Sequence, residues 1–319
     1  MLKRIVAVAL AAVIMAGLCA CTPPEEEPYE EIPAAKLLGD QDMRKTVLYF
    51  EDELGYIVPV MKQIPWVEGI GASAVSQLVA NPDADAQMAY FGLNPVLSEG
   101  AELSLSIKEG VAMIKLSEGA IAAANPVSEM NKVSAIVNTL TEFVSIDSVL
   151  IKQEGCKGKL PCGTDISKAF GTFDLNVVTT LSAADLDNAS KLLLYFENEA
   201  GTAIVPITKF VGGQADAFAA MSELVKGPGE GGLKNMFPQG TALLGVSVDD
   251  DGVASINFSK ELETIRETPE KEKKLLRCII LTLMQFDNIE EVRVLMDGKE
   301  FSSTAQKTMA YPEYINTMN

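Results

Sequence analysis

The sequence predicts an α+β fold built as two tandem copies of a small domain, each with two helices packed on a mostly antiparallel sheet. The segment LYFEDELGYIVPV at residues 48–60 returns as LYFENEAGTAIVPI at residues 194–207. Within each copy, predicted strands outnumber predicted helices, and hairpin signals join most neighbouring strands. Hairpin-linked strands form antiparallel sheets, and amphipathic helices bury one face of such a sheet.

The repeat extends through the tails of the two copies. Residues 159–176 parallel residues 299–316 in register, and the offset between matched residues stays between 140 and 146. Small drifts of this kind are loop insertions between fixed elements, so each copy is a complete domain. A stretch rich in Ser, Ala, Asp and Asn separates them. We therefore predict a first domain at residues 45–178, a linker at residues 179–190 and a second domain at residues 191–319.

Each copy begins with a hairpin and a helix. The first strands, at residues 47–50 and 192–196, lead through a glycine turn into strands that end in IVPV or IVPI. Apolar residues three and four apart then predict a helix, which Pro82 or Pro228 ends because proline cannot continue it. The periodic positions are Ala74, Val75, Leu78 and Val79 in the first copy, and Phe218, Met221, Leu224 and Val225 in the second.

The second half of each copy reads as a hairpin, a helix and a strand. Residues 103–107 and 254–258 alternate apolar with polar side chains, so one face of their sheet is buried. Thr268 followed by proline predicts the start of the helix in the second copy. Strands at residues 148–152 and 291–296 close the copies. The apolar helix stripe is Val133, Ile136, Val137, Leu140 and Phe143 in the first copy, and Leu275, Ile279, Leu283 and Phe286 in the second.

The N-terminus carries a targeting signal. A basic start precedes an apolar run at residues 5–18 that is shorter than a membrane span. The sequence LCAC that ends at Cys21 resembles a bacterial lipobox, which predicts a signal peptide at residues 1–20 and acylation of Cys21 at the extracytoplasmic face of the cell membrane. An ordinary signal peptide cut elsewhere is the alternative. Residues 21–44, rich in proline and glutamate, form a solvated tether.

The composition excludes several functions. The 26 Lys and Arg against 44 Asp and Glu give a net charge of −18, which becomes −20 when Lys3 and Arg4 leave with the signal. Such a surface repels phosphate backbones, so we expect no nucleic-acid partner. The chain has no histidine, which removes the commonest general base and metal ligand. We therefore expect no catalytic residues, no cofactor, no metal site and no enzymatic activity.

Three cysteines fall within the predicted domains. Cys156 and Cys162 flank the segment KGKLP, a spacing that allows a short disulfide in an oxidising exterior, and two free thiols are the open alternative. Cys278 lies on the apolar side of a helix pattern, which predicts a core position.

Three other groups of residues do not fit a phosphate-binding loop, a calcium-binding loop or a glycosidase active site. The glycine-rich residues 227–234 have Leu233 where a phosphate-binding P-loop needs a lysine. The aspartates at residues 249–251 lack the distal glutamate of a calcium loop, so a hairpin turn is the better interpretation. Trp66 is the only tryptophan, so the chain has few aromatic side chains on which a sugar could stack. Four scattered carboxylates are therefore better interpreted as solvated turn residues than as the catalytic pair of a glycosidase. These carboxylates are Glu51, Asp52, Glu197 and Glu199.

The order of motifs in the second copy points to a family. A helix ends in Gly-Pro, F-P-x-G-T follows, D-G-V begins a strand that ends in F-S, and a long helix leads into V-x-V-L-x-D-G. This order resembles the GerMN domain over nearly all of the chain after the tether. The first copy departs from it at Asn81, which replaces the loop glycine. The loop of the first copy can therefore differ from that of the second in its binding partner or in how well ordered it is. The family-motif loop comprises Gly227, Pro228, Phe237, Pro238, Gly240, Asp251 and Gly252.

The resemblance implies a non-enzymatic function. Members of this family are exported, are similar in fold to the ring-building motifs of secretion-type assemblies, and in spore formers support the complex between mother cell and forespore. The resemblance therefore implies a lipid-anchored protein that supports assembly or localisation of an envelope complex in sporulation or spore germination. Its partners are then the membrane and other envelope or sporulation proteins, with no small-molecule substrate.

Two alternatives stay open. The first is a lipid-anchored extracytoplasmic solute-binding receptor, although such receptors have larger lobes and a polar, aromatic cleft. The second, ranked last, is a hydrolase that uses Ser and Lys.

Overall fold

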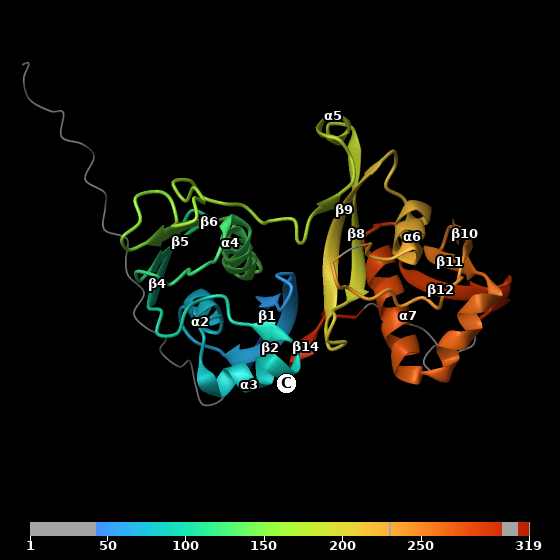
Figure 1. Ribbon diagram of the computed structural model, residues 1–319, viewed down its shortest axis with the longest axis horizontal. Helices are drawn as coiled ribbons and strands as arrows, with labels where there is room; N and C mark the ends of the chain where they lie inside the picture. The colour runs from blue at the N-terminus through green and yellow to red at the C-terminus, as the bar shows by residue number, and fades with distance from the viewer. Residues whose placement is uncertain (1–42, 230, 302–311, 319) are drawn as a thin grey trace, which may run out of the picture. The chain divides into compact units, whose positions relative to one another are not determined.

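The computed structural model describes residues 43–229, 231–301 and 312–318. The predicted signal peptide, most of the tether and Cys21 lie outside these residues. In Figure 1 the first copy runs from blue to green and the second from yellow to red. Nowhere in the described part of the chain is a helix both long and apolar enough to cross a membrane.

The two copies have the same order of major elements (Figure 1). The first contains β1 (Met43–Asp52), β2 (Ile57–Pro65), α2 (Ile70–Ser76), α3 (Pro82–Tyr90), β3 (Leu93–Asn94), β4 (Leu103–Lys108), β5 (Val111–Leu116), α4 (Pro126–Thr141) and β6 (Ser148–Gln153). The second contains β8 (Ala189–Glu197), β9 (Ile204–Gly212), α6 (Ala217–Lys226), β10 (Leu243–Val248), β11 (Val253–Phe258), η1 (Lys260–Glu267), α7 (Pro269–Leu283), β12 (Glu291–Met296) and β13 (Lys299–Glu300).

The predicted α+β architecture is confirmed, with two small sheets in each copy. In the first copy the antiparallel hairpin β1–β2 lies in one sheet, and β4, β5 and β6 form another. Strand β6 runs parallel to β5 because α4 carries the chain back between them, and β11, α7 and β12 repeat this arrangement. Since α4 packs against both β1 and β6, it joins the two sheets into one core.

The predicted apolar stripes are largely confirmed. Val133, Ile136 and Leu140 of α4 are fully buried, as are Ile279 and Leu283 of α7. The amphipathic pattern of these long helices therefore identified the core face correctly.

Two details of the sequence prediction were wrong for α2 and α6, the first helix of each copy. Phe218 is 53% exposed, because it stands at the start of α6 and the buried positions of the helix, which include Met221 and Leu224, come later. Helix α2 ends at Ser76, well before Pro82, since the next backbone N–H groups bond three residues back and tighten the last turn. Leu78 is nonetheless buried, so its predicted core position is confirmed.

The tails join the copies in a way that the sequence did not predict. Strand β7 (Val178–Thr179), which follows the first copy, pairs in parallel with β9 of the second. Strand β14 (Thr317–Met318), at the end of the second copy, pairs in parallel with β2 of the first. Each hairpin therefore receives a strand from the tail of the other copy, and α5 (Ala183–Leu186) lies in the linker between them.

Candidate functional site

The family-motif loop begins where α6 ends. Gly227 has φ of 88°, and a Cβ at this position would lie 2.8 Å from Nδ2 of Asn235, so only glycine fits without a shift. Asn235 donates from Nδ2 to the carbonyl of Val225 (3.1 Å) and accepts at Oδ1 from the N–H of Phe237 (3.0 Å). This asparagine therefore fastens the returning loop to the C-terminus of the helix.

The segment that follows closes a turn against the core. The ring of Phe237 is buried and packs on Phe258 of β11, with centroids 5.2 Å apart. Thr241 donates from both its N–H (3.1 Å) and its hydroxyl (2.8 Å) to the carbonyl of Pro238. The motif F-P-x-G-T is thus a scaffold that leads the chain into β10.

The D-G-V part of the motif also serves the framework. Asp249 accepts at Oδ1 from the N–H groups of Asp251 (3.1 Å) and Val253 (2.8 Å), which confirms the predicted hairpin turn. The carbonyl of Gly252 accepts from the N–H groups of Glu290 and Glu291, so this turn is tied to the end of the α7–β12 connection. Gly110 makes the matching contacts in the first copy.

A hollow of about 510 Å³ lies beside the motif loop. Its lining includes Lys234, Phe237, Thr264, Glu267 and Lys271. In the first copy the corresponding stretch after the first helix forms helix α3 instead of a glycine loop. The two copies therefore differ at this point, as the substitution of Asn81 for glycine suggested.

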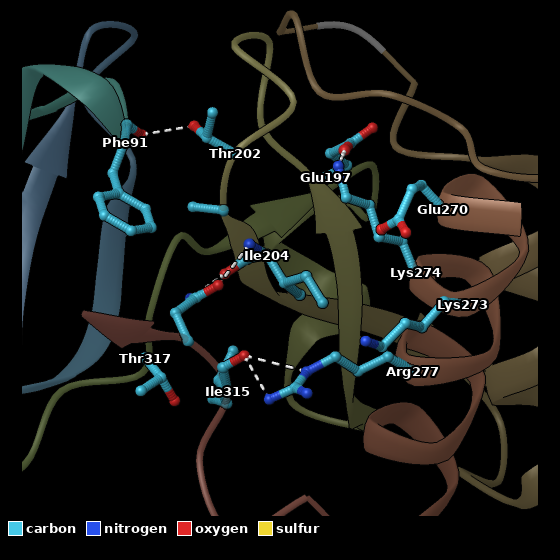
Figure 2. Close-up of a pocket in the computed structure, with 12 residues that line it drawn as sticks. Phe91, Glu197, Thr202, Ile204, Glu270, Lys273, Lys274, Arg277, Ile315 and Thr317 are labelled. Atoms are coloured by element: carbon cyan, nitrogen blue, oxygen red, sulfur yellow. Dashed lines mark hydrogen bonds and ion pairs between the residues drawn. The ribbon is translucent and has the colours of Figure 1, made fainter. Parts of the chain in front are cut away.

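A second hollow, of about 260 Å³, lies where β9, α7 and the end of the chain meet (Figure 2). Arg277 of α7 donates to the carbonyl of Ile315 from Nε (3.2 Å) and Nη2 (3.0 Å), and from Nη2 to that of Tyr314. Lys274 donates to the carbonyl of Gly201 (2.6 Å) and forms an ion pair with Glu197. The cations of this wall thus hold the tail and the hairpin turn in place.

The acidic side chains expected in turns are more buried than the sequence indicated. Asp52 is only 4% exposed and Glu197 only 6%. Oδ1 of Asp52 accepts from the N–H groups of Leu54 and Tyr56 (both 2.9 Å), and burial nonetheless raises its pKa. Asp52 organises its hairpin turn, whereas Glu197 pairs with Lys274, so the prediction that these two carboxylates are solvated was wrong and the turn role holds for Asp52 alone.

One buried carboxylate was not singled out from the sequence. Glu129 of α4 is fully buried and accepts from the N–H groups of Cys162 (2.6 Å) and Thr164 (2.9 Å). Burial alone would raise the pKa of Glu129, but the hydrogen bonds from Thr164 and Cys162 outweigh it and lower the pKa. A glutamate in the first turn of an amphipathic helix is usually a solvated charge that interacts with the helix N-terminus. The sequence therefore contained no sign that Glu129 is buried.

Cys156 and Cys162 are free thiols in the structure, and both are partly exposed. The sulfur of Cys162 contacts the carbonyl of Ala123 (3.5 Å), whereas that of Cys156 accepts from Nε2 of Gln153 (3.6 Å). The disulfide between them stays a prediction. Cys278 is buried in the core, as predicted, and burial raises its pKa to about 12.

No arrangement in the described residues supplies a metal site, since they hold no group of three carboxylate or cysteine ligands close enough for one ion. The aspartates at residues 249–251 line a shallow acidic hollow with Asp287 and Glu290. Asp249 is occupied by backbone N–H groups there, which fits a hairpin turn better than a calcium loop.

Comparison with known proteins gives a consistent result. The chain is 27% identical over 284 residues to the spore germination protein GerM of Bacillus subtilis (strain 168), covering 85% of this chain and 77% of that protein. Its fold is similar to the solved tandem GerMN domains of the sporulation protein GerM from Bacillus subtilis, with a TM-score of 0.65 and 26% identity over 87% of this chain and 100% of that one.

The family match covers both copies. A model of the family Germane, described as sporulation and spore germination, matches residues 47–158 and 193–302, which is more than half of the chain. The matched stretches contain the motif loop, and they coincide with the two repeated α+β frameworks. The chain belongs to the Germane (GerMN) family of sporulation and spore germination domains.

Proposed function

We propose that this chain is a non-enzymatic, lipid-anchored protein that supports assembly or localisation of an envelope protein complex in sporulation or spore germination. Membership of the family supports the biological setting. The proposed role in assembling or localising a complex is supported by one observation. The two copies share a framework but present different surfaces at the same point of the fold. Two related modules with different surfaces suit the bridging of two partners.

The difference lies after the first helix of each copy. In the first copy α3 ends at Tyr90, whose side chain is 74% exposed and packs edge-to-face on Phe91 with centroids 5.3 Å apart. In the second copy the glycine loop occupies this stretch. Exposed tyrosines are enriched where proteins bind one another, because a rigid amphipathic ring gives contact area at low entropic cost.

The polar groups of the interior support a binding function over catalysis. Glu129, Asp52 and Glu197 all hold backbone or cationic partners within the fold. A catalytic pair needs a nucleophile and a base within hydrogen-bond reach of each other and of a substrate. These carboxylates are committed to the framework instead.

A membrane-crosslinked pulldown from sporulating cells tests this proposal. We expect the chain to recover an identifiable envelope protein, and we expect Tyr90→Ser to reduce that recovery. Val144→Ser is the matched control, because Val144 is fully exposed just after α4 of the same copy. Recovery of no envelope protein by the unaltered chain would contradict the proposal.

The receptor alternative has its own test. Thermal unfolding of the mature chain would be followed with amino acids, sugars and peptidoglycan fragments. A solute-binding receptor gains stability by mass action when its ligand is added. We expect no saturable shift, and a saturable shift of several degrees would favour the receptor.

The proposed anchor rests on Cys21 alone. Cys21→Ser removes the thiol that would carry the lipid, so the chain should move from the membrane fraction to the soluble fraction. Membrane retention of the substituted chain would show that another segment anchors it.

A further inference from the structure

Two asparagines occupy matching positions in the tails of the two copies. The first tail (residues 173–179) and the second tail (residues 313–318) align so that Asn176 corresponds to Asn316. In the hairpins, Ile57 and Pro59 of β2 correspond to Ile204 and Pro206 of β9. The contacts of the two tails can therefore be compared residue by residue.

The first tail reaches both hairpins through Asn176. Its Oδ1 accepts from the N–H of Ile57 (2.8 Å), and its Nδ2 donates to the carbonyl of the same residue (2.8 Å). The same Nδ2 also donates to the carbonyl of Pro206 in the other copy (2.7 Å). One side chain thus completes the hydrogen bonds of its own hairpin and crosses to the second.

The second tail repeats this arrangement with the copies exchanged. Oδ1 of Asn316 accepts from the N–H of Ile204 (2.7 Å), and Nδ2 donates to the carbonyl of Ile204 (2.7 Å). Nδ2 also donates to the carbonyl of Pro59 in the first copy (2.9 Å). An asparagine amide offers two N–H donors and a carbonyl acceptor on a short side chain, whereas a serine or threonine hydroxyl has one donor, which explains asparagine at both positions.

The matching contacts continue on either side of the asparagines. Asp174 of the first tail forms an ion pair with Lys191 of the second copy (2.7 Å), and Glu313 of the second tail pairs with Lys45 of the first (3.1 Å). Lys45 and Lys191 are themselves matched positions, 146 residues apart. Beyond the asparagines, β7 and β14 pair in parallel with β9 and β2. Figure 2 shows the second tail beside Ile204, with Ile315 held by Arg277.

A contact in which residue i of one partner meets residue j of the other, and the reverse, is the signature of a two-fold dimer. We propose that the two copies pair as a two-fold dimer fused into one chain, and that each tail is a docking strand for the hairpin of a second GerMN copy. The two tails therefore bind the copies to each other, together with the hydrogen bonds that Thr202 (2.8 Å) and Asn198 (3.3 Å) donate to the carbonyl of Phe91, and the linker at residues 179–190 only connects the copies. The proposal concerns how the copies bind each other and does not rest on the proposed function.

A cut in the linker tests this directly. A protease site replaces residues 183–188 in the mature chain with Cys21→Ser, and cleavage is followed to completion by denaturing electrophoresis. At about 1 μM we expect the halves to elute together, at the volume of the uncut chain. Elution as two separate folded halves, identified by circular dichroism of each peak, would overturn the proposal.

Substitution of the two asparagines tests whether their side chains bind the two halves together. Asn176→Ala and Asn316→Ala each remove one hydrogen bond between the halves and two that fix the tail on its own hairpin, so the cut halves should dissociate roughly 10-fold more readily. Asn257→Ala is the matched control, because Asn257 accepts from Gly298 within the second copy alone. Equal dissociation of all three variants would overturn the assigned role, and circular dichroism separates this outcome from unfolding.

Discussion

The helix that follows the second hairpin is held differently in the two copies, although its sequence pattern is the same. In the first copy, Glu129 is fully buried and both of its carboxylate oxygens accept backbone hydrogen bonds. The matched Glu272 is 5% exposed, and its Oε1 has no partner within the described residues. The threonines behave likewise: Thr139 accepts from the N–H of Tyr49 (3.1 Å), and the hydroxyl of Thr282 has no partner in the same described part.

The comparison teaches that duplication preserved the apolar pattern more closely than the polar contacts. An apolar stripe needs only a complementary surface, whereas a buried polar group needs one partner in one geometry. We therefore expect matched substitutions to have unequal effects in the two copies.

The largest difference should come from the matched glutamates. Glu129→Gln places an amide donor against backbone N–H groups and removes two charge-assisted hydrogen bonds, so it should lower the free energy of unfolding by about 2 kcal/mol. Glu272→Gln should change it by about 0.5 kcal/mol or less, because fewer contacts are lost. Urea unfolding followed by circular dichroism reports both copies, and the fluorescence of Trp66, the only tryptophan, reports the first copy. Equal effects of the two substitutions would contradict the comparison.

The pH dependence should follow from the same glutamate. The folded state lowers the pKa of Glu129 below its ordinary value of 4.5. Its contribution to stability is therefore present above that value and is lost as the pH falls through the lower pKa of the folded state. The difference in unfolding free energy between the unaltered chain and Glu129→Gln should shrink below pH 4.5. Taking the difference cancels the opposite contributions of Glu51 and Asp52, whose pKa values burial raises.

The glycine loop offers a test confined to the second copy. Gly227→Ala should lower stability by about 1.5 kcal/mol, because φ is positive and the new Cβ would meet the side chain of Asn235. Gly229→Ala is the control: its φ is also positive, but nothing lies within 4 Å of the new Cβ. Thermal unfolding of the two variants should therefore differ, and equal losses would show that backbone strain alone matters here.

The smallest difference should lie at the helix caps. Asn125 accepts at its side chain from the N–H of Ser128 (2.9 Å), whereas Thr268 makes no such bond at the start of α7. Asn125→Ala should therefore cost about 1 kcal/mol and Thr268→Ala close to nothing. Urea unfolding measures both, and a larger loss for the threonine would reverse the assignment.

The sequence predicted the framework because long periodic elements carry their own signal. The stripe of α4, the alternation of β4 and β5, and the turns at Gly110 and Gly252 all follow from local chemistry. The exposed position of Phe218 was missed because helical spacing alone does not show where a helix leaves the core.

The contacts between the copies could not be predicted in the same way. Strand β14 has two residues, Thr317 and Met318, which is too short for any period, and its partner β2 lies more than 250 residues earlier in the chain. The match of Asn176 with Asn316 was visible in the alignment of the tails. Its meaning was not, because a single asparagine in an extended tail is compatible with any exposed turn.

Hydrogen exchange of the uncut chain with Asn316→Ala tests the central claim, that the exchanged tails bind the copies into one unit. The N–H of Ile204 in the second copy donates to the side chain of Asn316, and the N–H of Met61 in the first donates to its carbonyl (2.8 Å). We predict that both amides exchange faster in the variant, while Val133 in the core of the first copy is unchanged. Faster exchange at Ile204 with no change at Met61 would contradict the account, because the second tail would then act within its own copy alone.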